Sequence, residues 1–252
     1  MRIAVAGGTG TIGTLATAAA RSAGHEPVVL SRATGVDLLT GAGLPRALDG
    51  VEAVVDVTGT SSTATRPSVH FFGTVTLTLL DAERTAGVPH HVALSVIGAT
   101  AIDASYYAGK ATQERLLRAE KGGWSLLRTA QFHEFAEQLL RRGRVGPVQV
   151  VPSLRSQPIA ASEVATELVR IAASGPQGLV PDLAGPREEC MADLVRQLLR
   201  ATGRRRPVVQ VPLPGAWGRG LRDGSLLAGP DARRGRQTFA EWLHERRGAE
   251  AR

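Results

Sequence analysis

The chain has 252 residues, of which 43% are apolar and only one, Cys190, is a cysteine. This length and composition are those of a folded globular protein and exclude a disordered chain, and the lone cysteine excludes an internal disulfide framework. The formal net charge is +7, but the surplus arginine lies late in the chain without interleaved aromatic residues, so we expect a solvated surface and no nucleic-acid partner.

The amino terminus and the hydropathy pattern bear on location. The chain begins with an apolar run, Arg2–Ala6, and not with a charged lead, an apolar segment and a cleavage site. The Ala-rich run Leu15–Ala23 is shorter than the roughly 18 apolar residues of a membrane span and is interrupted by polar residues. We therefore expect a cytoplasmic protein with no membrane partner. We also expect a monomer or homodimer that binds a small-molecule substrate.

The first 130 residues alternate short apolar runs with helical patterns. The expected strands are 2–6, 27–30, 53–57, 91–96 and 124–128, and the expected helices are 12–22, 69–86 and 106–120. Strands that alternate with helices in this way indicate a parallel, doubly wound sheet with right-handed crossovers. The predicted fold class is therefore α/β, with a Rossmann-type domain over residues 1–130.

The alternation loosens beyond residue 130. The expected elements there are strands 148–151 and 208–211 and helices 162–173, 191–202 and 239–243. Prolines and glycines interrupt the last part of the chain before the terminal helix. We expect a smaller lobe over residues 131–252 that binds the substrate and is partly interleaved with the first domain.

A glycine-rich turn follows the first strand and reads Gly7-Gly8-Thr9-Gly10-Thr11-Ile12-Gly13. Between a strand and a helix, glycines with this spacing permit a tight turn, a close approach of the backbone to a pyrophosphate, and packing of the helix against the strand. The helix N-terminus adds free N–H groups and the positive end of the helix dipole. The turn therefore predicts a dinucleotide site.

The end of the second strand indicates which dinucleotide binds. NAD-preferring sites carry an acidic residue there for the ribose hydroxyls, whereas this strand ends with Leu30-Ser31-Arg32. Arginine and serine suit a 2′-phosphate through charge-assisted hydrogen bonds, so we expect NADP(H). Asp37 and Leu38 are expected near the adenine edge, and Thr58 and Gly59, after the third strand, are expected to line the cofactor.

A second group of residues follows the fourth strand. Tyr106 and Lys110 are four residues apart on one expected helix, so the phenol and the ammonium share a face. A nearby cation makes a tyrosine, whose unperturbed pKa is about 10, usable as an acid or base at neutral pH. Lys110 is one of two lysines among 30 basic residues. Ser95 ends the fourth strand, where ligands meet an open parallel sheet. The alternative is a surface pair and an ordinary strand-end serine.

The chain resembles the atypical, NmrA-like short-chain dehydrogenase/reductases. The stretches that carry the resemblance are the glycine turn 7–13, Leu94–Gly98, Tyr106–Lys110, Leu127–Phe135 and Gln157–Ala160. The resemblance implies that Ser95 binds the carbonyl oxygen of the substrate and that Tyr106 protonates this oxygen as hydride arrives from the nicotinamide. It also implies that Lys110 holds the ribose and lowers the pKa of the tyrosine. The same branch includes members that only sense NADP(H) and bind other proteins.

Three residues after the fifth strand are candidates for the substrate pocket. Gln131, Phe132 and His133 are expected near the nicotinamide edge or at the mouth of the pocket. The alternative for His133 is a structural role in the core. The pair His90-His91 has no carboxylate or thiol at ligand spacing, so we expect no metal site.

Together these features predict an NADPH-dependent oxidoreductase that reduces a carbonyl or conjugated group of a small, apolar organic molecule. Two alternatives remain open. The same acid–base pair and cofactor serve a non-redox cyclase, isomerase or dehydratase, or the protein is a non-catalytic NADP(H)-sensing regulator. Retention of Tyr106 and Lys110 argues against the regulator but does not separate the two kinds of enzyme. No motif of the second lobe identifies the substrate.

Overall fold

Short, apolar strands form a parallel sheet in the first of two compact units, which consists of residues 1–128 and 162–181. The computed structural model describes residues 1–102 and 104–250. The strands are β1 (Arg2–Ala6), β2 (Glu26–Leu30), β3 (Ala53–Asp56), β4 (His91–Val96), β5 (Trp124–Thr129) and β9 (Gly178–Leu179). β1 and β3 are almost wholly buried, which explains why both read as apolar runs without polar alternation.

The strand order in this unit is β2-β1-β3-β4-β5, with β9 paired to β5. The β1–β2, β1–β3, β3–β4 and β5–β9 pairs are parallel, and Val5 of β1 lies opposite both Val29 and Val55. The carboxyl ends of β1, β2 and β3 therefore meet at one edge of the sheet. The winding reverses beside β1, and such a switch point is where open α/β sheets bind ligands.

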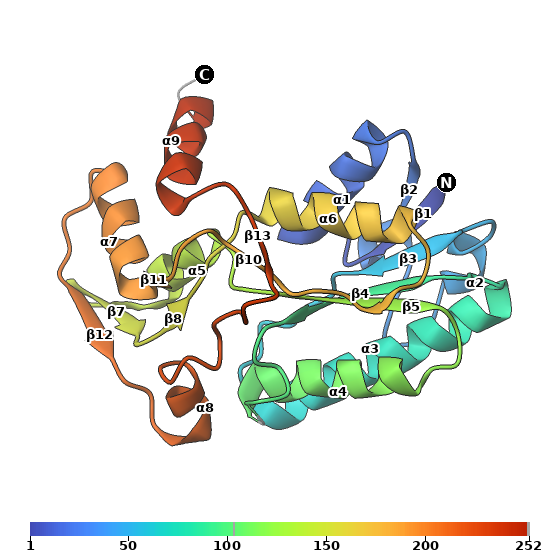
Figure 1. The fold of residues 1–252 in the computed structure, drawn as a ribbon, viewed down its shortest axis with the longest axis horizontal. Coiled ribbons are helices and arrows are strands. Elements are labelled where there is room, and N and C mark those ends of the chain that lie inside the picture. Colours follow the sequence, from blue (N-terminus) through green and yellow to red (C-terminus); the bar gives the residue numbers. More distant parts are fainter. Residues whose placement is uncertain (103, 251–252) are drawn as a thin grey trace. The chain divides into compact units, whose positions relative to one another are not determined.

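Helices cover both faces of this sheet (Figure 1). The helices are α1 (Thr11–Ser22), α2 (Leu44–Ala47), α3 (Thr65–Ala86), α4 (Ser105–Ala119) and α6 (Ala161–Ala173). α3 and α4 lie side by side on one face, and α1 and α6 lie on the other. On the second face, Val5 packs in one cluster with Ala16 of α1 and Ala165 of α6.

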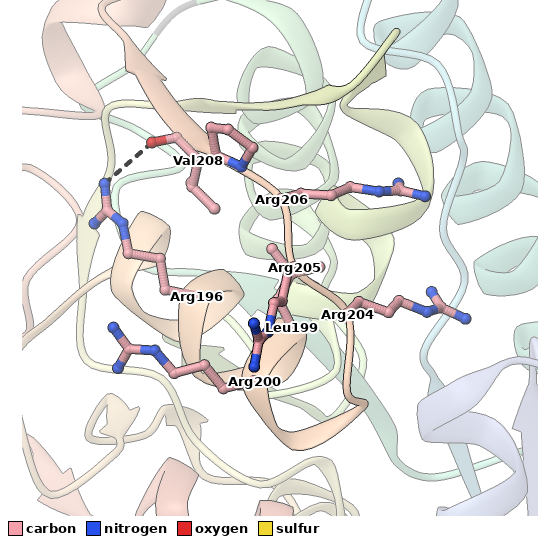
Figure 2. A pocket seen from close by; sticks show the side chains of 8 residues that line it. Arg196, Leu199, Arg200, Arg204, Arg205, Arg206 and Val208 are labelled. Atoms are coloured by element: carbon pink, nitrogen blue, oxygen red, sulfur yellow. Dashed lines mark hydrogen bonds between the residues drawn. The ribbon is translucent and has the colours of Figure 1, made fainter.

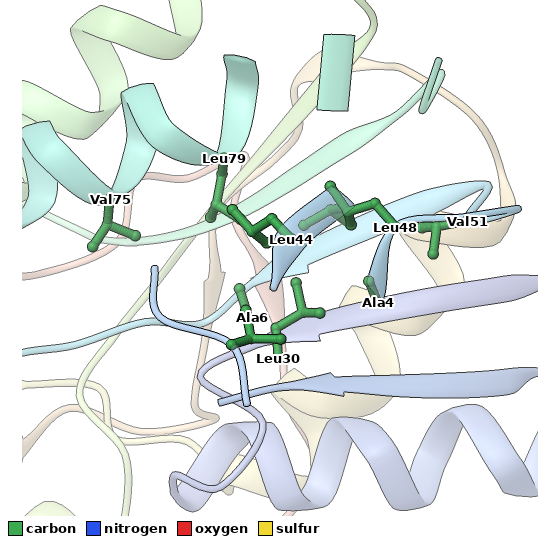
Figure 3. Packing of buried hydrophobic residues seen from close by; sticks show 10 residues of the cluster. Ala4, Ala6, Leu30, Leu44, Leu48, Val51, Val75 and Leu79 are labelled. Carbon is green, nitrogen blue, oxygen red and sulfur yellow. The ribbon is translucent and has the colours of Figure 1, made fainter. Parts of the chain in front are cut away.

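The larger core cluster lies on the face covered by α3 (Figure 3). Leu30 of β2, Leu44 of α2 and Leu79 of α3 meet there and are fully buried. Ala4 and Ala6 of β1 complete the floor of this cluster. Because the small side chains stand on the strand, the leucines of the helices pack directly against the sheet.

The second unit consists of residues 129–161 and 182–252. Its strands are β6 (Arg144–Val145), β7 (Val148–Pro152), β8 (Arg155–Ser156), β10 (Leu183–Ala184), β11 (Glu189–Cys190), β12 (Val208–Val211) and β13 (Arg233–Arg234). β7 pairs with β6 and β12, β8 pairs with β11, and β10 pairs with β13. Its helices are α5 (Phe135–Arg142), α7 (Met191–Ala201), α8 (Gly215–Gly220) and α9 (Phe239–Glu250).

The expected α/β class and parallel sheet are confirmed, and several details differ. Residues 162–181 lie beyond the expected bound at residue 130 but belong to the first unit, because α6 packs on the sheet and β9 pairs with β5; some interleaving was expected, but not its place in the chain. α5 was not expected, although Ala136 and Leu140 are buried at helical spacing. α9 extends to Glu250, beyond the expected end at residue 243. Within residues 1–102 and 104–250, no helix combines the length and the hydrophobicity needed to cross a bilayer.

A buried ion pair joins α3 to β4. His91 Nδ1 lies 2.8 Å from Glu83 Oε1, and both residues are buried. Burial opposes the imidazolium, but the charge and hydrogen bond of Glu83, with the charges of Asp56 and Glu120, together outweigh burial and raise the pKa of His91. Burial also raises the pKa of Glu83, against the opposing effect of His91. Both shifts make the folded state bind protons more tightly than the unfolded chain, so the pair contributes less stability as the pH rises.

We expect this contribution to be fully present below the unfolded histidine pKa of about 6.5 and to be lost as the pH rises through the raised pKa of His91. Glu83→Gln should therefore lower the free energy of unfolding by roughly 3 to 5 kcal/mol near pH 6 and by less in alkaline buffer. Urea unfolding of the parent and the variant at several pH values measures this difference. A difference that does not change with pH would contradict the charged pair.

Candidate functional site

The glycine turn has two positions at which a side chain does not fit. Gly7 has a φ of +78°, and a Cβ there would lie 3.1 Å from the Cα of Thr58. A Cβ on Gly13 would lie 2.2 Å from the carbonyl oxygen of Gly7. These close approaches of α1 and of the loop after β3 explain why the turn needs glycine.

The start of α1 is open. The N-cap residue, Gly10, provides no side-chain cap, and the first helical turn contains no acidic residue. Thr9, Gly10 and Thr11 are exposed, whereas Gly8 and Ile12 are buried. The first N–H groups of α1 and the positive end of its dipole are therefore available to an anion such as a phosphate.

The end of β2 presents an exposed arginine. Arg32 begins the short 3₁₀ helix η1 (Arg32–Thr34), and no residue within the described ranges pairs with its guanidinium. Ser31 caps η1, with its N–H 3.1 Å and its hydroxyl 3.3 Å from Thr34 Oγ1. An unpaired guanidinium at the end of the second strand is the feature from which we expect NADP(H).

The other residues expected to line the cofactor lie in two loops of the first unit. Asp37 Oδ1 accepts a 2.8 Å hydrogen bond from the Leu39 N–H, and Leu38 packs against the core cluster near α2 and α3. Thr58 is buried, and its Oγ1 has no hydrogen-bond partner in the part of the chain that the structure describes. Gly59 follows it and is exposed. A buried hydroxyl without a partner beside the glycine turn is suited to a polar ligand.

Tyr106 and Lys110 lie one turn apart on α4, as the spacing predicts. A Cβ on Gly59 would lie 3.9 Å from the Tyr106 hydroxyl, so the phenol oxygen lies beside the loop after β3. The Tyr106 ring packs edge-on against Phe72, with ring centroids 5.2 Å apart. Among the described residues, none hydrogen-bonds to the Tyr106 hydroxyl. Its proton is therefore available to a ligand.

The Lys110 ammonium is buried, with only 3% of the residue exposed. Its Nζ donates to the carbonyl oxygen of Leu94 at 2.8 Å and to Gln113 Oε1 at 2.9 Å. A third, longer contact of 3.4 Å reaches the carbonyl oxygen of Thr58. Nζ also lies 4.3 Å from the centroid of the Phe72 ring, a favourable cation–π distance. The protein thus provides an acceptor for each N–H of the ammonium.

Burial shifts both pKa values of this pair toward the neutral forms. It lowers the pKa of Lys110 to about 8, although the charges of Asp56 and Glu114 oppose the shift. It raises the pKa of Tyr106, and the carboxylate of Asp56 adds to the rise. The expectation that the pKa of Tyr106 is lowered is therefore wrong for the protein without ligand. Burial and Asp56 dominate at the phenol, while Lys110 is engaged by other acceptors.

Ser95 is tied to a buried carboxylate. Its hydroxyl donates a 2.7 Å hydrogen bond to Glu114 Oε1 of α4, and only 3% of Ser95 is exposed. Glu114 also accepts hydrogen bonds from Arg128 of β5. A serine hydroxyl has one proton to donate, so Ser95 does not donate to a substrate carbonyl while it bonds to Glu114. This geometry gives no support to the catalytic role that the resemblance implies for Ser95.

The residues expected to contact the substrate lie in the second unit. Gln131 and Phe132 are half-buried, and their contact with a substrate stays a prediction. His133 is 1% exposed and packs against Phe239 and Trp242 of α9, with centroid distances of 5.5 and 5.8 Å. Burial lowers its pKa to about 4, so the ring is neutral at physiological pH. This environment is that of a core histidine that anchors α9.

A cavity of about 450 Å³ lies at the C-terminal end of α7, in the second unit (Figure 2). It is lined by Arg196, Leu199, Arg200, Arg204, Arg205, Arg206, Pro207 and Val208. Arg196 pairs with Asp193, and Figure 2 shows that Arg204 and Arg206 extend away from Arg196 and Arg200. Because the guanidinium groups diverge, we assign no ligand to this cavity. Within the described residues, no cluster of histidine, cysteine and carboxylate side chains is suited to a metal ion.

Sequence reasoning missed the polar side chains that surround Lys110 and Ser95. These are Asp56, Gln113, Glu114 and Arg128. Two signals were present. Gln113 and Glu114 follow Lys110 by three and four residues, which places all three on one helix face. Asp56 ends an otherwise apolar strand, at the edge where ligands bind.

No protein-family model and no curated protein sequence matches the chain. Solved structures match over nearly its whole length. A short-chain dehydrogenase/reductase superfamily protein from Agrobacterium tumefaciens, with bound NAD, is 19% identical with a TM-score of 0.68, and the match covers 100% of this chain and 98% of that one. An NADPH-dependent quinone oxidoreductase from Escherichia coli, complexed with NADPH, is 18% identical with a TM-score of 0.69 and coverages of 96% and 99%.

A UDP-glucose 4-epimerase from Bifidobacterium longum, in complex with NAD+ and UDP, is 13% identical with a TM-score of 0.72, and the match covers 96% of each chain. At these identities the likeness bears on the fold and not on the activity. The chain shares the Rossmann-like α/β fold of these three proteins.

Proposed function

We propose that the protein is an NADPH-dependent oxidoreductase that reduces a carbonyl or conjugated group of a small, apolar organic molecule. The observation that carries this proposal is the phenol of Tyr106, which has no partner among the described residues and lies beside Gly59, in the unit that holds the open glycine turn. Lys110, one helical turn later, adds a cation to the same helix. A proton donor and a dinucleotide cradle together suit reduction.

The residues of the first unit fit a dinucleotide. The uncapped start of α1 would bind the pyrophosphate, and Gly13 allows the turn to close against the helix. Arg32 would pair with the 2′-phosphate. Lys110 would reach the ribose hydroxyls by giving up its longest contact, the one to Thr58. The bound nicotinamide would supply a hydride to the substrate.

Tyr106 would supply the proton. Because burial raises its pKa, the phenol stays protonated at neutral pH and is suited to act as an acid rather than as a base. Its proton would pass to the substrate oxygen on which negative charge develops. The ammonium of Lys110, on the same face of α4, would favour the resulting phenolate electrostatically. The Escherichia coli quinone oxidoreductase has this fold and is NADPH-dependent, and quinones are conjugated carbonyl compounds.

A regulator that binds NADP(H) without turnover is the second candidate. The observation that favours it is the bond between Ser95 and Glu114, which leaves Tyr106 without the serine that the resemblance implies as its partner. NADPH absorbance, followed with a panel of quinones, enones and aldehydes, tests both proposals, with mass spectrometry of the products. NADPH consumption supports the oxidoreductase. NADPH binding with neither consumption nor a new product supports the regulator, and a product without net consumption indicates non-redox chemistry.

Arg32→Ala tests the choice of cofactor. The parent should bind NADPH more tightly than NADH by about 1.5 to 3 kcal/mol, the worth of hydrogen bonds to a charged group, and the variant should lose most of this preference. Fluorescence titration with both cofactors measures the two affinities. Arg21→Ala, at an exposed arginine of α1, is the matched control and should keep the preference. Equal affinities in the parent would show that the NADP(H) assignment is wrong.

A further inference from the structure

A buried chain of hydrogen bonds connects Lys110 to a carboxylate that it does not touch. Gln113 Nε2 donates to Asp56 Oδ2 at 2.7 Å, and Gln113 Oε1 accepts from Lys110 Nζ at 2.9 Å. Asp56 and Gln113 are 0% exposed. The other carboxylate oxygen of Asp56 accepts a 2.9 Å hydrogen bond from the Thr58 N–H. These hydrogen bonds thus join β3, the loop after it, and α4.

The chemistry of the two ends determines the orientation of the amide. A carboxylate only accepts hydrogen bonds and an ammonium only donates them, so the NH₂ of Gln113 must face Asp56 and its oxygen must face Lys110. The opposite orientation would set a donor against the ammonium and an acceptor against the carboxylate. The contacts alone therefore determine the orientation of the Gln113 amide.

The three N–H groups of Lys110 are not held equally. The contacts to Leu94 and Gln113 are 2.8 and 2.9 Å, whereas the contact to Thr58 is 3.4 Å. A hydrogen bond weakens as it lengthens, so the N–H that faces the Thr58 loop is the one most easily exchanged for another acceptor. Thr58 Oγ1 lacks a partner among the described residues, which marks the same loop as suited to a polar ligand.

The other groups around Lys110 do not replace this link. Phe72 of α3 presents its ring face. Glu114 of α4 is the second nearby carboxylate, but it is engaged by Ser95 and Arg128. Asp56 on β3 is therefore the carboxylate that hydrogen bonds link to the Lys110 ammonium, with Gln113 as the one residue between them.

We propose that Gln113 is a positioning residue for Lys110. Anchored on Asp56, it holds the ammonium by one N–H and leaves the N–H that faces Thr58 as the one offered to the cofactor ribose. The first part of the proposal, that Gln113 holds the ammonium, does not depend on a cofactor. The second part, that the remaining N–H binds the ribose, rests on the proposed function.

Two lysines in the chain make the test direct. Lysine labelled with ¹³C at Cε gives one signal each for Lys110 and Lys121, and Lys121→Arg assigns them. The pKa of Lys110 is read from the pH dependence of its signal, without cofactor. Gln113→Met should lower this pKa by about one to two units, the equivalent of one hydrogen bond to a charged group. Thr112→Ala, one residue earlier on α4, is the control and should leave the pKa unchanged.

If Gln113→Met does not fold, a second variant that moves the carboxylate from position 56 to position 113 still tests the proposal. In the double variant Asp56→Asn with Gln113→Glu, the new amide donates to the new carboxylate, and this carboxylate accepts from Lys110. Every hydrogen bond between Lys110 and position 56 is thereby retained. The double variant should restore the pKa of Lys110 to the parental value or above, whereas Asp56→Asn alone should lower it.

The outcomes separate this inference from the proposed function. An unchanged Lys110 pKa in Gln113→Met overturns the positioning role, and so does a double variant whose Lys110 pKa is as low as that of Asp56→Asn. NADPH titration tests the second part, for which Gln113→Met should weaken binding by about tenfold. Unchanged affinity overturns that part. A parent that binds no NADPH defeats the proposed function and the second part, while the pKa measurement still decides the first.

Discussion

Replacing Tyr106 by phenylalanine is expected to lower kcat by a factor of about 10² or more, because a positioned proton donor contributes roughly that much to a reduction. NADPH affinity should stay near the parental value, since the ring still packs against Phe72 and the glycine turn is untouched. Steady-state kinetics on a substrate found in the carbonyl panel, together with a cofactor titration, measure both quantities.

Tyr107→Phe is the matched control for this experiment. Tyr107 is the other tyrosine of the chain and is buried beside Tyr106 on α4. Its variant loses one phenol hydroxyl in the same helical turn and should retain kcat within about twofold, an effect far below that of a lost acid. Full activity in Tyr106→Phe, or an equal loss in Tyr107→Phe, would exclude Tyr106 as the acid.

Arg128→Leu is expected to lower the free energy of unfolding strongly. Arg128 of β5 donates to both oxygens of Glu114, which is 1% exposed. Without the guanidinium this carboxylate stays buried without its main counter-charge, and loss of one partner of a buried pair costs about 3 to 5 kcal/mol. Urea unfolding should show this decrease in the free energy of unfolding. It should come from a lower midpoint with a similar slope.

Two further variants test the cause of that loss. Arg118 also pairs with Glu114, at 3.6 Å, but its side chain is 43% exposed, so Arg118→Leu should cost less than about 1 kcal/mol. Glu114→Leu combined with Arg128→Leu removes both charges and should recover most of the stability lost in the single variant. If the double variant is as unstable as Arg128→Leu, the loss of stability comes from packing and not from the unpaired Glu114 carboxylate.

The cofactor half of the candidate site follows largely from local patterns. A glycine at position 13 is needed because α1 and the turn approach each other, and this requirement is set by the strand–turn–helix order visible in the sequence. The spacing of Tyr106 and Lys110 similarly places both side chains on one helix face, whatever surrounds the helix. Predictions of this kind depend on residues within one or two turns of each other.

The protonation states did not follow from such patterns. The spacing suggests that Lys110 lowers the pKa of Tyr106, but burial and the charge of Asp56 raise it. Asp56 lies 50 residues before Tyr106, and sheet formation brings it to α4. Desolvation and long-range charges depend on the packed structure, so a sequence window cannot supply them.

The hydrogen bond of Ser95 could not be predicted for the same reason. Its position at the end of β4 is that of a ligand-binding serine, yet its hydroxyl donates to Glu114, 19 residues later in the chain. The extent of the first unit also depended on distant contacts. Residues 162–181 have no sequence feature that attaches them to residues 1–128. Tertiary contacts attach them, among them the packing of Ala165 beside Val5 and the pairing of β9 with β5.

Hydrophobic periodicity and glycine placement were sufficient for strands β1 to β5 and the longer helices between them, the parallel sheet, the glycine turn, and the helix that carries Tyr106 and Lys110. These features are local, because a strand, a turn or a helix face is defined by neighbouring residues. The tertiary structure was needed for the buried links among Asp56, Gln113, Lys110, Glu114 and Arg128. Partners from two strands and one helix meet there only after the sheet has formed, and burial then shifts the pKa values that determine their charges.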